Sequence, residues 1–416
     1  MDILKLATYC SEAKMRVKIT PGRAKGHIQA PPSKSMAHRM LIAAAMADGE
    51  SLIKGVSECD DVRATLSCLE SLGVRIEKNG SDYRVFGTDF KKITHQGELF
   101  CRESGSTIRM LIPPATLSGN TVCFTASEGL LKRPMTPYKE IYEDLGFLFE
   151  RTDRGYLVKG SIPAGEYTIP GNLSSQFISG LIFALAALKG ESIIKITPPI
   201  ESRSYIDMTL EAIKHFSATA FFEDDLTIRI KGGGYKACEA CVEGDYSGAA
   251  FPYALNLLGG EVEISGLSES SSQGDKVYRE YFRLLSLGTP EIDISDCPDL
   301  GPILFAMAAA KGGARFTGTK RLKVKESDRA AAMAEELSKL GISLLVEENS
   351  VTVESTKLCS PTEPIHSHND HRIVMATAIL LTQVGGEIIG AEAINKSYPD
   401  FFKDLMKLNI DLEIYE

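Results

Sequence analysis

The sequence predicts a mixed α/β (α+β) protein in which one βαβαββ unit occurs six times, grouped as two domains of three units. Its 416 residues are too many for one ordinary hydrophobic core. One order of segments recurs: a polar opening, a helix of small apolar residues, a glycine, a strand, a second helix and further strands. The openings lie roughly 70 residues apart, with one gap nearer about 50, and this period is too long for a simple solenoid.

The first three units follow one another from residue 33 onward. They begin at the polar openings SKSMAHR, ESGSTIR and SSQFISG, and the second helix of the first unit is DDVRATLSCLESLG. The Gly-rich stretch KGGGYKACEACVEGD follows the third unit and is typical of a boundary between domains. We therefore predict a first domain over residues 33–243.

The other three units form the second predicted domain, over residues 244–416. They begin at DYSGAAF, CPDLGPI and NDHRIVM. Residues 1–32 contain the strand-like stretch RVKIT but precede the first complete unit. We expect residues 1–32 to complete the second domain, so that the chain passes between the domains twice.

The composition argues against several classes of protein. The chain is 44% hydrophobic, and its net charge of −9 argues against non-specific binding of nucleic acid or anionic membrane. The runs LIFALAAL and IVMATAILL are too short to span a bilayer, and MDILKLATYCSEAK lacks the apolar core of a secretory signal. Nine scattered cysteines fit reduced thiols better than a disulfide framework. We expect a cytoplasmic monomer.

Two stretches have some features of metal sites, but we interpret both otherwise. Cys238 and Cys241 form a CxxC motif without a second pair. HSHNDH, residues 366–371, contains three histidines, but no cysteine or distant histidine completes a convincing set. We interpret this stretch as a polar loop that ends in a helix cap, and we expect no metal.

The polar openings suggest an anion site between the domains. Helix N-termini bind phosphates and carboxylates, and they converge if three units surround a threefold axis. For any single cation, a surface or capping role remains the alternative. Because the cations recur at equivalent positions of the repeated units, we favour a shared ligand. The cations gathered at the openings are Lys34, Arg39, Arg109, Arg133, Lys325, Arg329, Arg372 and Lys396.

The stretch RLKVKESDR, residues 321–329, contains four cations and two carboxylates. At helical spacing Arg329 aligns with the apolar residues Met333, Leu337 and Leu340. A cation at the head of a buried stripe, at a helix N-terminus, requires a negative partner. We interpret Arg321 and Lys323 as charges that frame the site, and Ser327 and Asp328 as the cap of the helix that follows.

Neutral polar residues and carboxylates complete the candidate site. Asp299 and Glu326 lie among the positive charges, where helix capping is the alternative to roles as general base and general acid. Side chains suited to a phosphate or a hydroxyl-bearing ligand are Ser174, Ser175, Gln176, Ser202 and Tyr205.

In combination, these motifs resemble the 5-enolpyruvylshikimate-3-phosphate (EPSP) synthase family, the 3-phosphoshikimate 1-carboxyvinyltransferases, over nearly the whole chain. The resemblance implies the enolpyruvyl transferase fold, an inside-out α/β barrel with three βαβαββ units per domain around a pseudo-threefold axis. It also implies transfer of the enolpyruvyl group of phosphoenolpyruvate to the 5-hydroxyl of shikimate 3-phosphate, through a tetrahedral intermediate and without a metal or organic cofactor. The motifs are SKSMAHR, SGSTIR, LKRP, SSQF, SRSYID, EGDYS, QGD, PD, VKESDR, NDHR and NKSYPDFF.

The resemblance assigns a role to each candidate residue. It implies that Asp299 takes the proton of the 5-hydroxyl, with Lys325 alongside, that Glu326 protonates the methylene carbon, and that Lys34 joins this catalytic set. Shikimate 3-phosphate would be held by Lys34, Ser35, Arg39, Ser174, Ser175, Gln176, Ser202, Tyr205, Asp299 and Lys325. Phosphoenolpyruvate would be held by Lys34, Gly105, Arg133, Gln176, Arg329, Arg372 and Lys396, with its carboxylate as the negative partner of Arg329.

Two residues depart from the family pattern. Glu103 and Arg321 both stand where asparagine is frequent in the family, and a carboxylate at Glu103 requires a neutralising cation such as Lys132. Gly105 stands where glyphosate-insensitive members often carry a larger residue. We therefore expect glyphosate to inhibit this protein by competing with phosphoenolpyruvate.

The sequence disfavours two other functions. UDP-N-acetylglucosamine enolpyruvyl transferases share the fold and the donor, but they usually carry a cysteine where this chain has GLLKRPM, and a Lys-Asn pair where it has Lys34-Ser35. A non-catalytic repeat protein that binds a ligand or RNA in its clefts is disfavoured by the acidic net charge and by Asp299 and Glu326.

Overall fold

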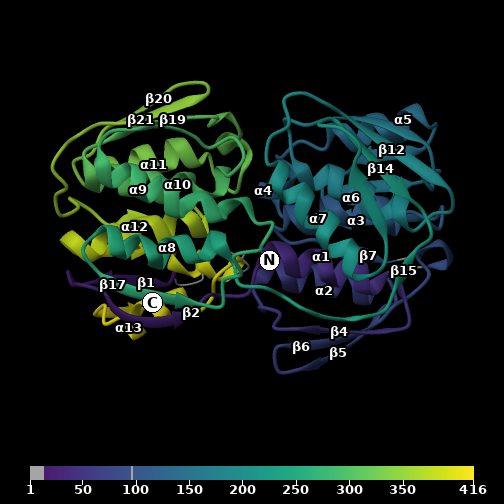
Figure 1. Cartoon of the computed structure of the whole chain (residues 1–416), viewed down its shortest axis with the longest axis horizontal. Coiled ribbons are helices and arrows are strands. Elements are labelled where there is room, and N and C mark those ends of the chain that lie inside the picture. Colours follow the sequence, from purple (N-terminus) through teal and green to yellow (C-terminus); the bar gives the residue numbers. More distant parts are fainter. Residues whose placement is uncertain (1–13, 95–96) are drawn as a thin grey trace, which may run out of the picture.

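The computed structural model describes residues 14–94 and 97–416, so the expectation about MDILKLATYCSEAK falls almost wholly outside the described residues. The chain forms two lobes that lie side by side (Figure 1). One hydrophobic core draws on residues from Met36 to Val242. The other combines Val17–Ile28 with residues from Tyr246 to Leu412. Within the described ranges, no helix has the length and apolar character needed to cross a membrane.

The first lobe is built around three four-stranded sheets, ordered β16-β4-β6-β5, β7-β8-β10-β9 and β11-β12-β14-β13. Its helices are α1 (Lys34–Ala45), α2 (Asp60–Ser71), α3 (Gly105–Ala115), α4 (Glu128–Leu131), α5 (Thr136–Asp144), α6 (Ser175–Ala186) and α7 (Arg203–His215), with the 3-10 helix η1 (Phe90–Lys92). Its strands are β3 (Ala47–Asp48), β4 (Glu50–Lys54), β5 (Arg75–Asn79), β6 (Asp82–Phe86), β7 (Glu98–Phe100), β8 (Thr121–Thr125), β9 (Leu148–Arg151), β10 (Gly155–Lys159), β11 (Glu166–Pro170), β12 (Glu191–Thr197), β13 (Thr219–Phe222), β14 (Thr227–Lys231), β15 (Tyr235–Lys236) and β16 (Glu239–Cys241).

The second lobe has two four-stranded sheets, ordered β22-β23-β1-β24 and β18-β19-β21-β20, and the pair β17-β2. Its helices are α8 (Tyr246–Leu257), α9 (Tyr278–Leu287), α10 (Gly301–Lys311), α11 (Arg329–Ser338), α12 (His371–Val384) and α13 (Phe401–Lys407), with the 3-10 helices η2 (Gly274–Val277), η3 (Pro298–Leu300), η4 (Lys320–Val324) and η5 (Ala391–Lys396). Its strands are β1 (Arg16–Ile19), β2 (Lys25–Gln29), β17 (Glu261–Ser265), β18 (Glu291–Asp293), β19 (Ala314–Thr317), β20 (Leu344–Val346), β21 (Ser350–Val353), β22 (Ile365–His366), β23 (Gly386–Ile389) and β24 (Leu412–Tyr415).

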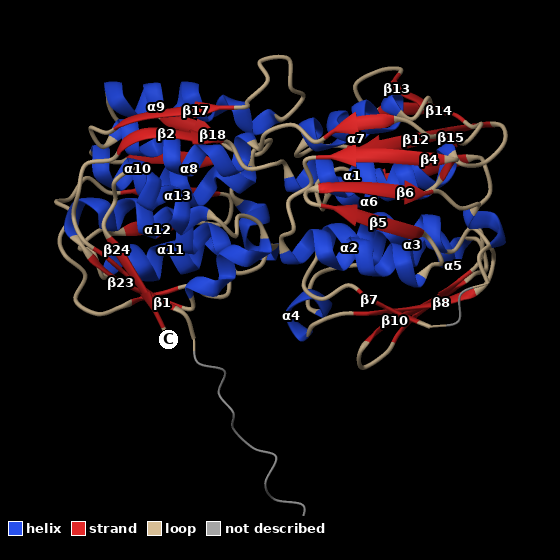
Figure 2. Ribbon diagram, turned by 90° about the horizontal axis from the view of Figure 1, so that it is seen from below, coloured by secondary structure: helices blue, strands red, loops and turns tan. Residues whose placement is uncertain are grey.

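All the four-stranded sheets share one pairing pattern, which confirms the predicted fold class. In each of them one parallel pair is followed by two antiparallel pairings, as in β11-β12-β14-β13. A crossover helix joins the parallel strands β11 and β12, and a second helix leads to the antiparallel strands, which gives the order βαβαββ. Figure 2 shows the sheets at the periphery of each lobe, with helices packed between them. Nearly every residue of α6 and α12 is buried, because these helices are enclosed on all sides.

The chain passes between the lobes at two places that lie next to each other. Strand β1 completes the sheet of β22, β23 and β24, whereas β16 pairs with β4 in the other lobe. The two crossing segments are joined by backbone hydrogen bonds from the N–H of Ser33 to the carbonyl of Glu243 at 2.8 Å and from the N–H of Asp245 to the carbonyl of Pro31 at 2.7 Å. Helices α1 and α8 therefore both begin beside this double crossing.

Helices α3 and α6 come unusually close, and this contact positions the start of both. A Cβ added to Gly180 would lie 2.5 Å from the carbonyl oxygen of Arg109, so the approach requires glycine. Pro113 cannot donate a hydrogen bond to that carbonyl, and the hydroxyl of Tyr138 donates to it instead, at 2.7 Å. The helix thus continues through two prolines, and the side chain of Arg109 stays at its N-terminal end.

Candidate active site

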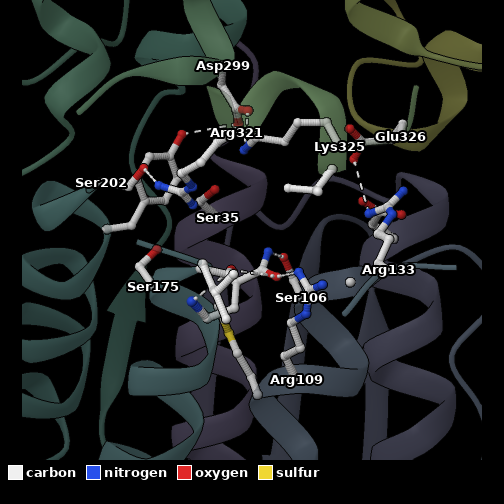
Figure 3. Close-up of a pocket in the computed structure, with 18 of the residues that line it drawn as sticks. Ser35, Ser106, Arg109, Arg133, Ser175, Ser202, Asp299, Arg321, Lys325 and Glu326 are labelled. Atoms are coloured by element: carbon white, nitrogen blue, oxygen red, sulfur yellow. Dashed lines mark hydrogen bonds and ion pairs between the residues drawn. The ribbon is translucent and has the colours of Figure 1, made fainter. Parts of the chain in front are cut away.

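A pocket of about 830 Å³, counting the part open to solvent, lies between the two lobes. The first turns of α1, α3 and α6 form its floor, which confirms that these helix N-termini converge. The second lobe contributes η3, η4 and the residues that follow η4, rather than the N-termini of α8, α10 and α12. Figure 3 shows cations and carboxylates from both lobes facing this space.

Most of the residues predicted for the site line this pocket. Arg329 and Arg372 do not line it but bind the side chain of Asp299, and Lys396 lies beside Glu103. The predicted residues that line it are Lys34, Ser35, Arg39, Gly105, Arg109, Arg133, Ser174, Ser175, Gln176, Ser202, Tyr205, Asp299, Lys325 and Glu326.

Serine residues cap the three helices that form the floor. Ser33 and Ser104 accept hydrogen bonds from backbone N–H groups of the first turns of α1 and α3, and Ser174 accepts from the N–H of Gln176 at 3.3 Å in α6. The side chain of Gln176 binds Ser106 at 2.9 Å through its amide nitrogen. Ser175 has no role in this cap, so its hydroxyl is available to a ligand.

Two cations of the first lobe differ in their partners: Lys34 binds a carboxylate, whereas Arg39 binds neutral acceptors. Lys34 forms an ion pair of 2.9 Å with Asp61. Burial lowers the pKa of Lys34, but nearby groups, Asp61 foremost among them, together raise it above its ordinary value. Arg39 donates to neutral acceptors, the side chain of Thr209 and the carbonyls of Ser35 and Tyr205. Burial therefore lowers the pKa of Arg39 to about 10.

Gly105 allows two arginines to approach the start of α3. A Cβ at Gly105 would lie 3.2 Å from Nη1 of Arg133, so a larger residue would push that guanidinium group away, and 3.6 Å from Nη1 of Arg109, which is an ordinary contact. Arg109 donates to Oε1 of Gln176 at 3.0 Å but has no carboxylate partner among the described residues. Burial lowers the pKa of Arg109 to about 9, and the nearby Arg133 adds to the effect. This cluster suits an anionic ligand.

Asp299 is the carboxylate with the most cationic partners in the pocket. Its Oδ1 atom lies 3.0 Å from Nζ of Lys325 and 2.8 Å from Arg329, and its Oδ2 atom lies 3.1 Å from Arg372. Burial would raise the pKa of Asp299, but these three cations hold it well below its usual range. Burial in turn lowers the pKa of Lys325 to about 8, although Asp299 opposes the shift.

Glu326 lies on the other side of the pocket and is also ionised. Its Oε2 atom binds Arg329 at 2.5 Å. Its Oε1 atom lies 3.9 Å from Arg133 (Figure 3). Burial would raise the pKa of Glu326, but Arg329 and Arg133 hold it well below its usual range. Glu326 and Asp299 are therefore joined through one guanidinium, that of Arg329.

Arg329 is buried at the head of the apolar stripe, as the spacing predicts, but its negative partners are protein carboxylates. Besides Asp299 and Glu326, it binds Asp370, whose Oδ2 atom lies 2.8 Å from Nε. The expectation that a ligand carboxylate supplies the missing anion is thus incomplete, because the chain itself neutralises this cation in the structure. Asp370 was not predicted, although its position as the N-cap of α12 confirms the predicted cap in HSHNDH.

Two other interpretations of the RLKVKESDR stretch require correction. Arg321 was interpreted as framing charge, but it is buried and donates to the hydroxyl of Ser202 at 2.6 Å across the pocket. Asp328 caps α11 alone, because Ser327 donates instead to Asp370 at 3.1 Å.

Glu103 is neutralised from the opposite lobe and not by Lys132. Its carboxylate forms an ion pair with Lys396 and accepts from the side-chain amide of Asn369 at 3.0 Å. Lys132 instead pairs with Glu128 at 2.7 Å. The reason is the position of η5, which brings the ammonium of Lys396 to the start of α3.

Glu335, Glu336 and His368 come close enough together to resemble a metal site. The two oxygens of Glu336 are already bound by Nζ of Lys339 at 2.7 Å and by the ring of His368 at 2.6 Å. The ammonium of Lys339 disfavours a cation there. Cys238 and Cys241 are both free thiols.

Comparison with known proteins identifies the family of this chain. The family model described as EPSP synthase (3-phosphoshikimate 1-carboxyvinyltransferase) matches residues 19–405. A 3-phosphoshikimate 1-carboxyvinyltransferase of Clostridium perfringens is 38% identical over 94% of this chain and 98% of its own length. One of Clostridium beijerinckii is 37% identical over 94% and 97%. The structure of an EPSP synthase from Acinetobacter baumannii superposes with a TM-score of 0.78 over 97% of this chain and all of that chain, at 22% identity, which supports the fold. The chain belongs to the EPSP synthase family.

Proposed function

We propose that this protein transfers the enolpyruvyl group of phosphoenolpyruvate to the 5-hydroxyl of shikimate 3-phosphate and releases phosphate. The observation that carries the proposal is the pocket itself, in which three helix N-termini and cations from both lobes surround two ionised carboxylates. Two multiply charged anions require such a concentration of positive charge if they are to be held together. Membership of the EPSP synthase family supports the same reaction.

We propose that each substrate is held by residues from both lobes. Shikimate 3-phosphate would be held through Lys34, Ser35, Arg39, Ser174, Ser175, Gln176, Ser202, Tyr205, Asp299 and Lys325, and to this set we add Arg321. Phosphoenolpyruvate would be held through Lys34, Gly105, Arg133, Gln176, Arg329, Arg372 and Lys396, and to this set we add Arg109. Guanidinium groups suit both ligands, because they bind carboxylates and phosphates with paired hydrogen bonds.

The reaction then needs one base and one acid. Asp299 accepts the proton of the 5-hydroxyl as its oxygen attacks C2 of phosphoenolpyruvate, and Glu326 donates a proton to C3. The product of this addition is a tetrahedral intermediate that carries both substrates. Loss of a proton from the new methyl group and cleavage of the C2–O bond to phosphate restore the double bond. Each carboxyl group thus reverses its role between addition and elimination.

The ion pairs of the free protein explain how Glu326 acquires its proton. In the structure Glu326 is ionised because Arg329 and Arg133 neutralise it. Phosphoenolpyruvate bound at these two arginines would compete with Glu326 for their positive charge. Its own negative charge would then raise the pKa of Glu326. Substrate binding would therefore convert Glu326 from an ion-pair partner into an acid.

Finer properties belong to the same proposal. Glyphosate would compete with phosphoenolpyruvate beside Gly105. The domain division at residues 33–243, with 1–32 and 244–416 in the second domain, is supported by the two hydrophobic cores. The protein would act as a cytoplasmic monomer without a metal or cofactor.

The test is phosphate release from phosphoenolpyruvate with shikimate 3-phosphate as acceptor, run in parallel with UDP-N-acetylglucosamine. Release that depends on shikimate 3-phosphate alone is the expected result. Release with UDP-N-acetylglucosamine alone would favour the related transferase, and no release with either acceptor would contradict the proposed reaction.

A further inference from the structure

Asp275 is a buried carboxyl group that the proposed reaction does not use. It lies in η2 of the second lobe and is 2% exposed. Its Oδ2 atom lies 3.2 Å from the hydroxyl of Tyr205, which comes from α7 of the first lobe. Its Oδ1 atom has no hydrogen-bond partner, and no lysine or arginine forms an ion pair with it among the described residues. An ionised carboxylate in such a place is costly.

The hydroxyl of Tyr205 contacts a second carboxyl group. It lies 3.2 Å from Oδ2 of Asp299 as well as 3.2 Å from Oδ2 of Asp275. A phenol has one proton, so it donates to one of the two oxygens at a time. The other contact becomes a hydrogen bond in its own right when that carboxyl group carries a proton and donates it to the phenol oxygen.

The charges around the two carboxyl groups decide which one carries the proton. Lys325, Arg329 and Arg372 hold Asp299 ionised. Burial raises the pKa of Asp275 to about 6, and the negative charge of Asp299 adds to this shift. The titratable groups that face Asp275 are Asp245, Cys297, Asp299, Tyr205 and Arg372. Of these only Arg372 favours the ionised form, and its side chain binds Asp299. The neutral hydroxyl of Ser247 also opposes the shift, but burial and Asp299 outweigh both groups.

We propose that Asp275 acts as a neutral carboxylic acid that donates its proton to the oxygen of Tyr205, so that the proton of Tyr205 points to Asp299. This inference rests on the proposed function, because the role of Asp299 as base belongs to it. Asp275 is then a positioning residue. Through Tyr205 it fixes the orientation of the Asp299 carboxylate, with Tyr205 and Arg372 on one oxygen and Lys325 on the other.

Two substitutions separate a neutral donor from a carboxylate. In Asp275→Asn the amide N–H replaces the acid O–H as donor to Tyr205, with almost the same shape. In Asp275→Ala the donor is lost, and Tyr205 is free to turn. At a pH below about 6, where Asp275 carries its proton, we expect kcat of Asp275→Asn to remain close to that of the unmodified protein and kcat of Asp275→Ala to fall about tenfold, the value of one hydrogen bond to a buried group. An Asn variant as slow as the Ala variant would overturn the proposal.

The pH profile gives a second readout. Asp275 donates below its pKa and loses this ability as the pH rises through it, whereas asparagine does not titrate. The ratio of kcat/KM for Asp275→Asn to that of the unmodified protein should therefore rise as the pH passes upward through about 6. A ratio that is constant with pH would contradict a protonated Asp275.

A double substitution tests the path through Tyr205. In a Tyr205→Phe background Asp275→Ala should lower kcat no further, because the phenol that transmits its effect is gone. A further tenfold loss would show that Asp275 acts by another route. Circular dichroism and thermal unfolding of each variant exclude misfolding as the cause.

One measurement does not depend on activity. A protonated carboxyl group has a carbonyl stretch in the infrared that a carboxylate lacks. Below pH about 6 the difference spectrum between the unmodified protein and Asp275→Asn should contain this band. Its absence would overturn the inference even if the proposed reaction holds, and its presence in a protein without the expected turnover would assign the failure to the proposed function.

Discussion

Replacement of Asp370 by alanine should reduce the free energy of unfolding by about 3–4 kcal/mol, a value that follows from the bonds it makes. Asp370 is fully buried, and it accepts from Nε of Arg329 at 2.8 Å, from the backbone N–H of Arg372 at 2.9 Å and from the hydroxyl of Ser327 at 3.1 Å. A hydrogen bond to a charged partner contributes about 1.5–3 kcal/mol and a helix N-cap about 1 kcal/mol. In the alanine variant Arg329 retains its ion pairs with Asp299 and Glu326. The loss in free energy of unfolding therefore stays below that caused by a fully unpaired buried charge.

Asp370→Asn separates the contribution of the helix cap from that of the ion pair with Arg329. The amide oxygen can still accept from the N–H of Arg372 and cap α12, but the charge that pairs with Arg329 is gone. We expect a loss of about 2 kcal/mol, between the unmodified protein and Asp370→Ala. Asp400→Ala is the matched control, since Asp400 occupies the N-cap position of α13 without making a cap hydrogen bond and is exposed.

Urea unfolding followed by circular dichroism measures these differences, because the chain contains no tryptophan for fluorescence. Asp400→Ala should stay within about 0.5 kcal/mol of the unmodified protein. An unchanged midpoint for Asp370→Ala would refute the reasoning that Asp370 anchors Arg329 and α12. Equal losses for Asp370→Asn and Asp370→Ala would refute the contribution assigned to the cap.

Three further predictions concern catalysis. Glu326→Gln and Asp299→Ala should each lower kcat by at least about 100-fold with the fold intact, and near-normal turnover in either variant would remove that residue from the acid–base pair. Glu103→Gln should lower KM for phosphoenolpyruvate several-fold with little change in kcat, because it frees Lys396 from an ion pair; a higher KM would mean that Glu103 positions Lys396 for the substrate. For the free protein, kcat/KM for shikimate 3-phosphate should fall above pH about 8 as Lys325 loses its proton, and Lys325→Arg should move this decline to higher pH. A decline at the same pH in the arginine variant would assign it to another group.

The fold could be predicted from the sequence because each unit has its own local pattern of helix and strand residues. A buried helix of small residues such as α6, followed by a strand such as β12, is encoded within one continuous stretch. The one short gap between openings also has a structural reason. The unit that begins at α8 contributes only β17, paired with β2 from near the N-terminus, in place of a four-stranded sheet. The register of such distant pairings is set by packing and not by a local signal.

The residues of the site were predictable from the sequence, but the hydrogen bonds and ion pairs among them were not. Helical periodicity indicated that Arg329 is buried, yet its partner Asp370 lies 41 residues away in another unit. Glu103 and Lys396 lie in different lobes, so the ion pair between them depends on how the lobes meet. The burial of Arg321 was not predictable, because a cation within a run of charges has no periodic signal that separates a buried position from an exposed one.

The central claim is that the cation-lined pocket between the lobes joins phosphoenolpyruvate to shikimate 3-phosphate. The most direct test measures phosphate released from phosphoenolpyruvate with and without shikimate 3-phosphate, for the unmodified protein and for Glu326→Gln. Acceptor-dependent release by the unmodified protein, largely lost in Glu326→Gln, is the predicted result. No acceptor-dependent release by the folded, unmodified protein would contradict the account.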